Sequence, residues 1–84
     1  MTSSHEITVV LDGETARLAQ GITLRETVAR HIGRELDPDG TPADGGRLGV
    51  AVAVDGAVVP RREWHAHVIA AGSTIDVVTA TQGG

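Results

Sequence analysis

Two histidines stand close enough along the chain to suggest a metal site. His65 and His67 are two positions apart, so on a strand both imidazoles would lie on one face and could bind a metal with a third ligand. The chain has no cysteine, and its other histidines, His5 and His31, fall in other predicted elements. We therefore interpret His65 and His67 as solvated turn residues and predict no metal.

Three aspartates lie in a segment rich in glycine and proline. Counted from Asp37, the calcium-binding EF-hand pattern requires Gly at its sixth position and Glu at its twelfth, but Pro42 and Leu48 stand there. We therefore assign Asp37, Asp39 and Asp44 to a solvated loop.

The residue types needed for catalysis by the chain itself are scarce. There is no cysteine, and all 7 basic side chains are arginines, which excludes a thiolate nucleophile, a Schiff-base lysine and a P-loop lysine. Ser3, Ser4 and Ser73 lie outside any nucleophile signature. We therefore predict that the chain is not an enzyme.

The C-terminal end is the remaining candidate for chemistry. Gln82 precedes a terminal Gly83-Gly84 pair. Because 11 of the 84 residues are glycine, such a pair ends a chain by chance in roughly 2% of cases. Residues 81–84 have no apolar anchor, so we expect them to form a flexible tail.

Length and charge limit the protein that carries these residues. A chain of 84 residues with a formal net charge of −4 has room for one small domain. The acidic balance argues against a nucleic-acid partner, which requires a basic face. The sequence shows no signal-peptide pattern, and its longest aliphatic run is far shorter than a membrane span. We therefore expect a cytoplasmic protein with no nucleic-acid or membrane partner.

The first residues predict a β-hairpin. Apolar and polar side chains alternate over Glu6–Leu11, which is the pattern of a half-buried strand. Asp12-Gly13 is a dipeptide of tight hairpin turns, because glycine adopts a positive φ at little cost. We expect the return strand over Glu14–Ala19.

A capping box marks the start of the one predicted helix. The Thr23 hydroxyl can accept from the amide of Glu26, and the Glu26 carboxylate can accept from the amide of Thr23. Apolar residues recur on one face over Leu24–Ile32, and Gly33 suits the left-handed position that ends a helix. Residues 34–48 are rich in Asp, Gly and Pro with almost no apolar mass, so we expect a flexible loop.

The second half predicts three strands. Residues 49–54 are the most strand-like run, Asp55-Gly56 forms a second hairpin turn, and residues 57–59 return. A polar turn over residues 61–67 then precedes a last strand over residues 75–80.

Together these elements predict a two-layer α+β domain over residues 1–80, because one helix cannot cover both faces of a sheet. Trp64, the only aromatic residue, is expected either to fill the core or to anchor a protein interface.

Two segments of the chain resemble a known family. Residues 54–64 hold a hairpin and a Val-Pro-Arg-x-x-Trp turn, and residues 75–84 hold a Val-rich strand and the terminal Gly-Gly. They resemble the ThiS family, the sulfur carriers of thiamine biosynthesis. Gly72-Ser73 departs mildly from the Gly-Asp-like turn of that family, and residues 34–48 look like an insertion. The resemblance implies the ubiquitin-like β-grasp fold, in which a mixed sheet of about five strands packs on one main helix and the last strand lies parallel beside the first.

The resemblance also implies a role for the last residues. An ATP-dependent adenylating enzyme similar to ThiF would convert the Gly84 carboxylate into an acyl-adenylate, and sulfur from a donor such as a cysteine desulfurase would displace AMP. The resulting thiocarboxylate would donate sulfur to a thiazole synthase similar to ThiG. Gln82 and Gly83 would thread a narrow channel to the nucleotide, and at Gly83 and Gly84 a Cβ would clash with its walls. The chain itself would bind no cofactor.

A partner that encloses the tail must also touch the surface from which the tail emerges. We expect docking on the sheet face away from the helix, near the last strand, with Val78 as the best candidate and Arg61, Arg62 and Trp64 as further contacts. Two alternatives stay open. One is a β-grasp sulfur carrier for another pathway, such as molybdopterin or secondary-metabolite synthesis, and the other is a non-covalent β-grasp interaction module.

Overall fold

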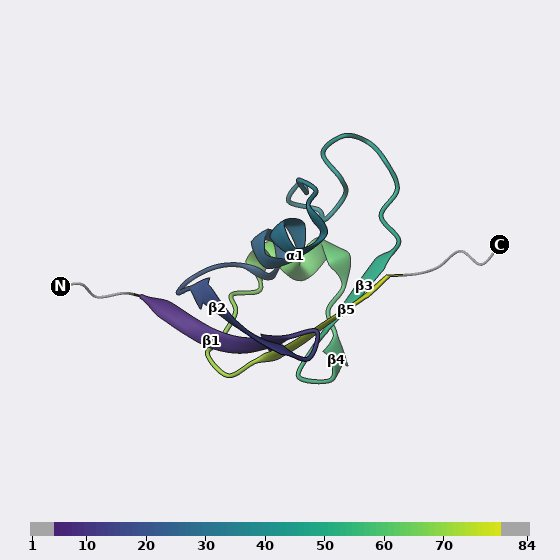
Figure 1. Cartoon of the computed structure of the whole chain (residues 1–84). Coiled ribbons are helices and arrows are strands. Elements are labelled where there is room, and N and C mark those ends of the chain that lie inside the picture. Colours follow the sequence, from purple (N-terminus) through teal and green to yellow (C-terminus); the bar gives the residue numbers. More distant parts are fainter. Residues whose placement is uncertain (1–4, 80–84) are drawn as a thin grey trace.

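The structure, a computed structural model, describes residues 5–79. Five strands form one mixed sheet, and helix α1 and a short 3₁₀ helix, η1, lie on one side of it (Figure 1). The elements in chain order are β1 (Glu6–Leu11), β2 (Glu14–Ala19), α1 (Leu24–Ile32), β3 (Val50–Val54), β4 (Ala57–Val58), η1 (Arg61–Ala66) and β5 (Thr74–Thr79). This arrangement confirms the expected α+β fold, a five-stranded sheet packed on one main helix.

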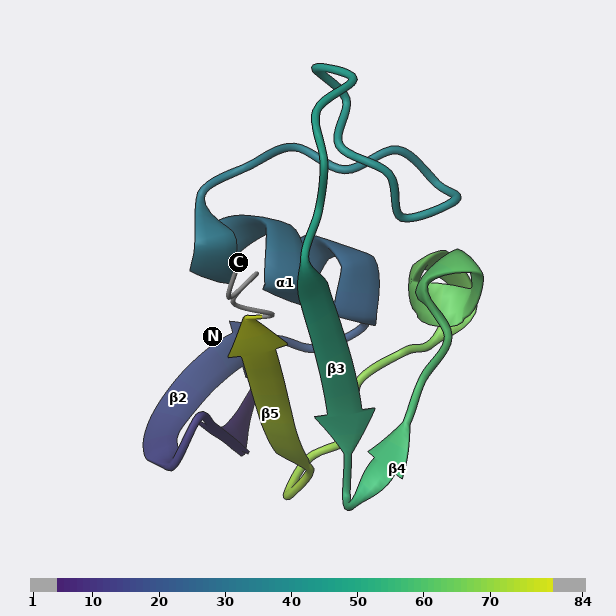
Figure 2. The ribbon, with the colours of Figure 1, turned by 90° about the vertical axis from the view of Figure 1, so that its right-hand side faces the viewer.

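The order of the strands across the sheet is β2-β1-β5-β3-β4. β1 and β5 are the two parallel neighbours, and β5 pairs antiparallel with β3 on its other side. The arrows of β3 and β5 point in opposite directions in Figure 2. The last strand therefore lies parallel beside the first, as expected. It also lies at the centre of the sheet, although it is the last element of the chain.

Both hairpin turns have the predicted conformation. Asp12 and Gly13 have φ values of 52° and 83°, and Asp55 and Gly56 have φ values of 52° and 86°. Two successive positive φ values define the turn whose twist matches that of the flanking strands. β3 begins one residue later than predicted, β4 ends one residue earlier, and β5 begins one residue earlier. The predicted end of β5, Ala80, lies outside the described residues.

The helix begins and ends at the predicted residues. The Glu26 amide donates to Thr23 Oγ1 over 3.2 Å, and the Thr23 amide donates to Glu26 Oε1 over 3.2 Å, which completes the capping box. Gly33 closes the helix with a φ of 73°. Leu24 and Val28 face the sheet and are fully buried.

Trp64 is a core residue, so the alternative of an exposed interface anchor is wrong. Only 1% of its surface is exposed, and its indole Nε1–H donates to the Val59 carbonyl over 2.9 Å. It lies on η1, which forms where only a polar turn was expected. Trp64 is the largest of the fully buried side chains, so η1 acts as a second cover of the sheet beside α1.

The segment of residues 34–48 contains no helix or strand, but it does bury apolar surface, contrary to expectation. Leu36 and Leu48 belong to the hydrophobic core, and an isolated bridge joins Leu36 to Pro42. Arg25 of α1 donates from Nη1 to the Leu36 carbonyl over 2.6 Å. The loop rises from the end of α1 and returns to the start of β3 (Figure 2). Its flexibility stays a prediction.

Candidate functional site at the end of β5

The predicted reacting end of the chain, Gln82 to Gly84, lies outside the described residues. The structure describes the chain as far as Thr79, the last residue of β5, from which residues 80–84 continue. The candidate site is therefore the surface around the end of β5. It is built by β5, the beginning of β3, the end of α1 and the β1–β2 turn.

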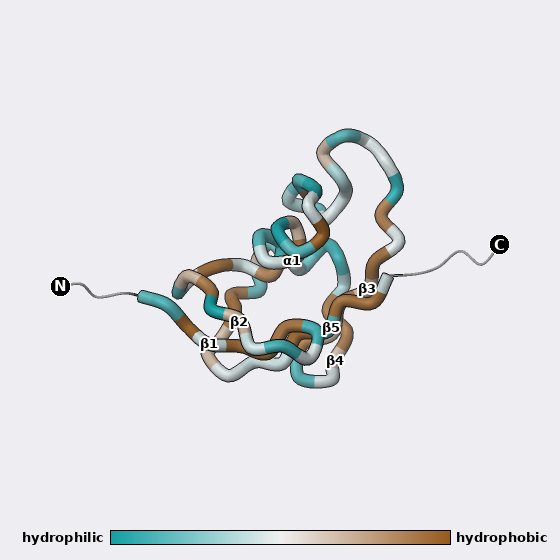
Figure 3. Tube along the Cα trace, viewed as in Figure 1, coloured by the Kyte–Doolittle hydropathy of each residue, from teal (hydrophilic) through white to brown (hydrophobic). Residues whose placement is uncertain are grey.

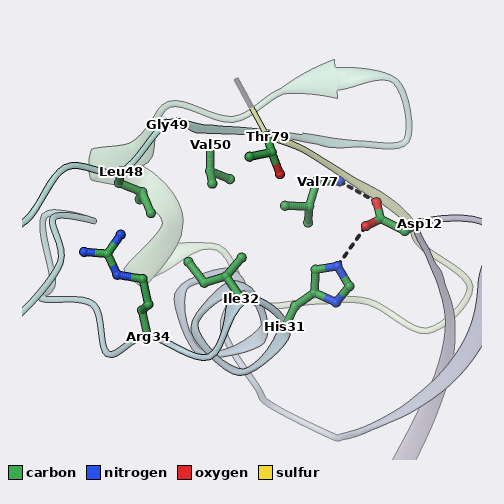
Figure 4. A pocket seen from close by; sticks show the side chains of 9 residues that line it. All are labelled: Asp12, His31, Ile32, Arg34, Leu48, Gly49, Val50, Val77 and Thr79. Atoms are coloured by element: carbon green, nitrogen blue, oxygen red, sulfur yellow. Dashed lines mark hydrogen bonds and ion pairs between the residues drawn. The ribbon is translucent and has the colours of Figure 1, made fainter. Parts of the chain in front are cut away.

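The turn residue Asp12 joins three of these elements. Its Oδ1 atom accepts a hydrogen bond from the backbone amide of Val77 over 2.7 Å, and its Oδ2 atom is 2.8 Å from Nε2 of His31 (Figure 4). The hydrogen bond from Val77, with a smaller contribution from His31, lowers the pKa of Asp12 below its usual value. The carboxylate thus fixes the hairpin turn to the end of α1 and to β5.

A hollow of about 460 Å³ lies between α1 and the end of β5. Its apolar wall comes from side chains of α1, the loop and two strands: Ile32, Leu48, Val50 and Val77. Asp12, His31, Arg34 and Thr79 add polar groups at its rim (Figure 4). The hollow therefore lies on the helix side of the sheet, directly beside the point where β5 ends.

Arg34 links the rim of the hollow to the loop. Its Nη1 atom donates to the Arg47 carbonyl over 2.7 Å, and its Nη2 atom is 3.1 Å from the Asp44 carboxylate. The amide of Gly46 and the guanidinium of Arg34 together lower the pKa of Asp44. Asp44 is therefore a partner of Arg34 within the loop, and Asp37 and Asp39 do not join it in a metal site: residues 5–79 contain no cluster of three or more potential metal ligands.

The opposite face of the sheet carries exposed valines. Val78 is 60% exposed and Val58 is 72% exposed, whereas Ile75 on the other face of β5 is fully buried. Ala51 is the cross-strand partner of Val78, so small apolar residues continue the patch across β3. The chain at β3 is coloured largely as hydrophobic in Figure 3. The expectation that Val78 points away from the helix is confirmed. Whether a partner docks there stays a prediction.

The expected arginine contacts do not lie on that face. Arg61 is half-buried, and its Nη2 atom donates to the Leu48 carbonyl over 2.9 Å, which ties η1 to the loop. Arg62 is exposed on η1, in the layer with α1. The structure therefore places Arg61 and Arg62 on the helix side of the sheet and Val78 on the opposite side, so they do not form one surface.

The contact between Asp12 and His31 has no signature in the sequence that would predict it. The two residues are 19 positions apart, and each has an ordinary local role, one in a turn and one in the last turn of a helix. The only local signal was the basic side chain near a helix end, which is common in any helix.

None of the helices within residues 5–79 is long and apolar enough to cross a membrane.

Comparison with known proteins gives two findings. The model of the ThiS family matches residues 2–84. A solved structure of a thiamine biosynthesis protein (ThiS) from Geobacter metallireducens has a TM-score of 0.66 against this chain at 16% sequence identity, and the match covers 93% of this chain and 100% of that one. The curated proteins include no match to the chain. The structural likeness confirms the β-grasp fold.

Proposed function

The chain belongs to the ThiS family, and from this premise we propose that it is a sulfur carrier of thiamine biosynthesis with the Gly84 carboxylate as the reacting group. The observation that carries the proposal is the family match over residues 2–84, a range that includes the terminal Gly83-Gly84. The position of β5 supports it, because this central strand leads directly into residues 80–84.

The proposed chemistry begins with activation of a poor electrophile. An adenylating enzyme similar to ThiF transfers AMP from ATP to the Gly84 carboxylate and releases pyrophosphate. A persulfide sulfur from a donor such as a cysteine desulfurase then attacks the carbonyl carbon, and AMP leaves. A thiol cleaves the remaining S–S bond, so that a thiocarboxylate stays on Gly84 and the thiol is oxidised to a disulfide. A thiazole synthase similar to ThiG takes the sulfur.

The folded domain holds the C-terminal segment in position for the partner enzymes. A thiocarboxylate is nucleophilic at neutral pH because it is fully ionised there, so the carrier need not activate it. What the domain supplies is a fixed starting point for the tail: five residue pairs with β3 and the Asp12–Val77 hydrogen bond hold β5. The catalytic residues belong to the partner enzymes. Because the reaction consumes ATP, the carrier works in the cytoplasm.

The face that carries Val78 is the proposed docking surface for these enzymes. Val78 and Val58 leave more than half of their surface exposed, and Ala51 and Ala53 lie between them across the strands, with the exposed Asp76 opposite Ala53 at the border of the patch. An open apolar patch of this kind next to the reacting end is typical of a protein interface. Arg61 and Trp64 do not contribute to this surface. The Arg61 guanidinium bonds to the Leu48 carbonyl on the helix side of the sheet, and Trp64 is buried in the core.

Mass spectrometry of the protein purified from thiamine-producing cells tests the proposal. We expect a species heavier by about 16 Da, as oxygen is replaced by sulfur, and a fragment spectrum that assigns the added mass to Gly84. A chain that lacks Gly84, expressed in parallel, should show no such species. If the full chain never gains this mass when the adenylating enzyme and the sulfur donor are present, the proposal is wrong.

A further inference from the structure

β5 is paired unequally on its two sides. Toward β3, pairing extends over five residue pairs, from Ile75 to Thr79. Toward β1, it extends over only two, the last of which joins Leu11 to Ile75. β1 ends there, because the chain turns away into β2 at Asp12. Within the described residues, the last part of β5, residues 77–79, thus has a neighbouring strand on one side only.

The hydrogen-bonding groups that face this open side can be assigned from the alternation along β5. The Ile75 carbonyl accepts from the Asp12 amide on the β1 side over 2.8 Å, and the Thr74 carbonyl accepts from the residue after β3 over 2.7 Å. Backbone groups of successive residues point to opposite sides of a strand. Val77 and Thr79, like Ile75, therefore direct their amide and carbonyl groups to the side of β1.

One of these groups already has a partner. The Val77 amide donates to Oδ1 of Asp12, so this carboxylate takes the position that a carbonyl of a longer β1 would occupy. The Val77 carbonyl and the Thr79 amide come next along the same edge, where no strand of residues 5–79 lies beside them. Backbone groups at an unpaired edge are a ready template for an added strand.

The hollow lies under this same edge. Val77 and Thr79 line it together with Ile32 and Val50, so aliphatic side chains lie directly under the edge, with the polar groups of the hollow around them. A strand added beside residues 77–79 would direct alternate side chains toward the helix side of the sheet, where the hollow is. Main-chain hydrogen bonds to the edge and a pocket for an alternate side chain are the two requirements for recognition by strand addition.

We propose that an extended segment of the adenylating partner adds as a strand to the open edge of β5 at residues 77–79 and places an aliphatic side chain in the hollow. The inference rests on the proposed function, because residues 80–84 continue from this edge and a partner that encloses Gly84 must pass along it. The strand would receive a hydrogen bond from the Thr79 amide and donate one to the Val77 carbonyl.

A matched pair of variants tests the inference. Thr79→Pro removes the amide that faces the open edge, whereas the bonds of β5 to β3 are made by the residues that alternate with it. Thr79→Ala changes the same side chain but keeps the amide. We expect Thr79→Pro to weaken binding to the adenylating partner at least about tenfold relative to Thr79→Ala, with equal unfolding midpoints for the two variants. In the wild-type complex, hydrogen exchange of the Thr79 amide should slow relative to the free carrier.

The outcomes separate this inference from the proposed function. If wild type supports ATP–pyrophosphate exchange but the two variants bind equally well, the added strand is excluded and the carrier function stands. If wild type supports no exchange, the proposed function itself fails. If sedimentation shows that the chain dimerises, and Thr79→Pro abolishes the dimer without weakening partner binding, the edge pairs with a second copy and the inference is overturned.

Discussion

Asp12 and His31 lie 19 positions apart in sequence, and their side chains meet at 2.8 Å between the last turn of α1 and β5. The same carboxylate also accepts from the Val77 amide. One side chain therefore joins the first hairpin, the end of α1 and the strand that continues into residues 80–84. The contribution of this three-way contact of Asp12 to the free energy of unfolding can be measured directly.

Replacement of Asp12 should destabilise the fold in a graded way. Asn and Gly both tolerate the positive φ at this position, so the backbone is not strained in either variant. Asp12→Gly removes the acceptor for the Val77 amide and should lower the free energy of unfolding by about 1–2 kcal/mol. Asp12→Asn keeps an oxygen acceptor at this position, so its free energy of unfolding should lie between those of wild type and Asp12→Gly. Chemical denaturation gives the free energy of unfolding of all three proteins. Equal values would contradict a stabilising role of the Asp12 side chain.

The stability contributed by Asp12 should depend on pH. The hydrogen bond from Val77, and then His31, lower the pKa of Asp12 in the folded chain below its ordinary value of 3.8. An acid with a lowered pKa contributes stability that is fully present above its ordinary pKa and is lost as the pH falls toward the folded one. The difference in unfolding free energy between wild type and Asp12→Asn should therefore shrink below pH 3.8. A difference that stays constant from neutral pH into that range would argue against the lowered pKa.

The exposed face of β5 should decide how well the carrier is adenylated. Val78→Asp places a charge in the apolar patch. It should raise the apparent KM of the adenylating enzyme for the carrier at least about tenfold, and the unfolding midpoint of the carrier should not change. Val68→Asp is the matched control, because Val68 is 59% exposed but lies outside the sheet strands. Equal activation of the two variants would remove Val78 from the interface.

The length of the tail should be critical for the proposed chemistry. Deletion of Gly84 leaves the terminal carboxylate on Gly83, one residue short of its position. One residue added after Gly84 moves the carboxylate outward by about 3.3 Å. A misplacement of about 1 Å can already reduce a rate about 100-fold, so both variants should lose ATP–pyrophosphate exchange. Their unfolding midpoints should match that of wild type, because the described core is built from Val9 to Ile75. Normal exchange by either variant would contradict Gly84 as the reacting group.

The parts of the fold that sequence analysis predicted well depend on contacts between near neighbours. The turn at Asp12-Gly13 needs two residues that accept a positive φ, and the capping box needs Thr23 and Glu26 three positions apart. Both signals lie within a few residues, so they can be read without knowledge of the fold. The parallel pairing of β1 and β5 came from the family resemblance and not from a local pattern.

The parts that sequence analysis missed depend on contacts between distant residues. Leu36 and Leu48 stand alone in a polar loop, and only the position of the loop over the core buries them. Trp64 allowed two interpretations because burial of an indole depends on an acceptor, here the Val59 carbonyl, whose position the local sequence does not define. The contact of Asp12 with His31 belongs to the same class.

The parallel arrangement of β1 and β5 also determines how the domain responds to force. Traction on the chain beyond Thr79 pulls β5 along its own axis, past β1 and β3, so the hydrogen bonds of both ladders are loaded together in shear rather than opened one after another. A partner enzyme that pulled on residues 80–84 would therefore load both ladders at once and would not open the sheet bond by bond. A proteolytic motor that starts from the same end would meet its strongest resistance at the first strand it reaches.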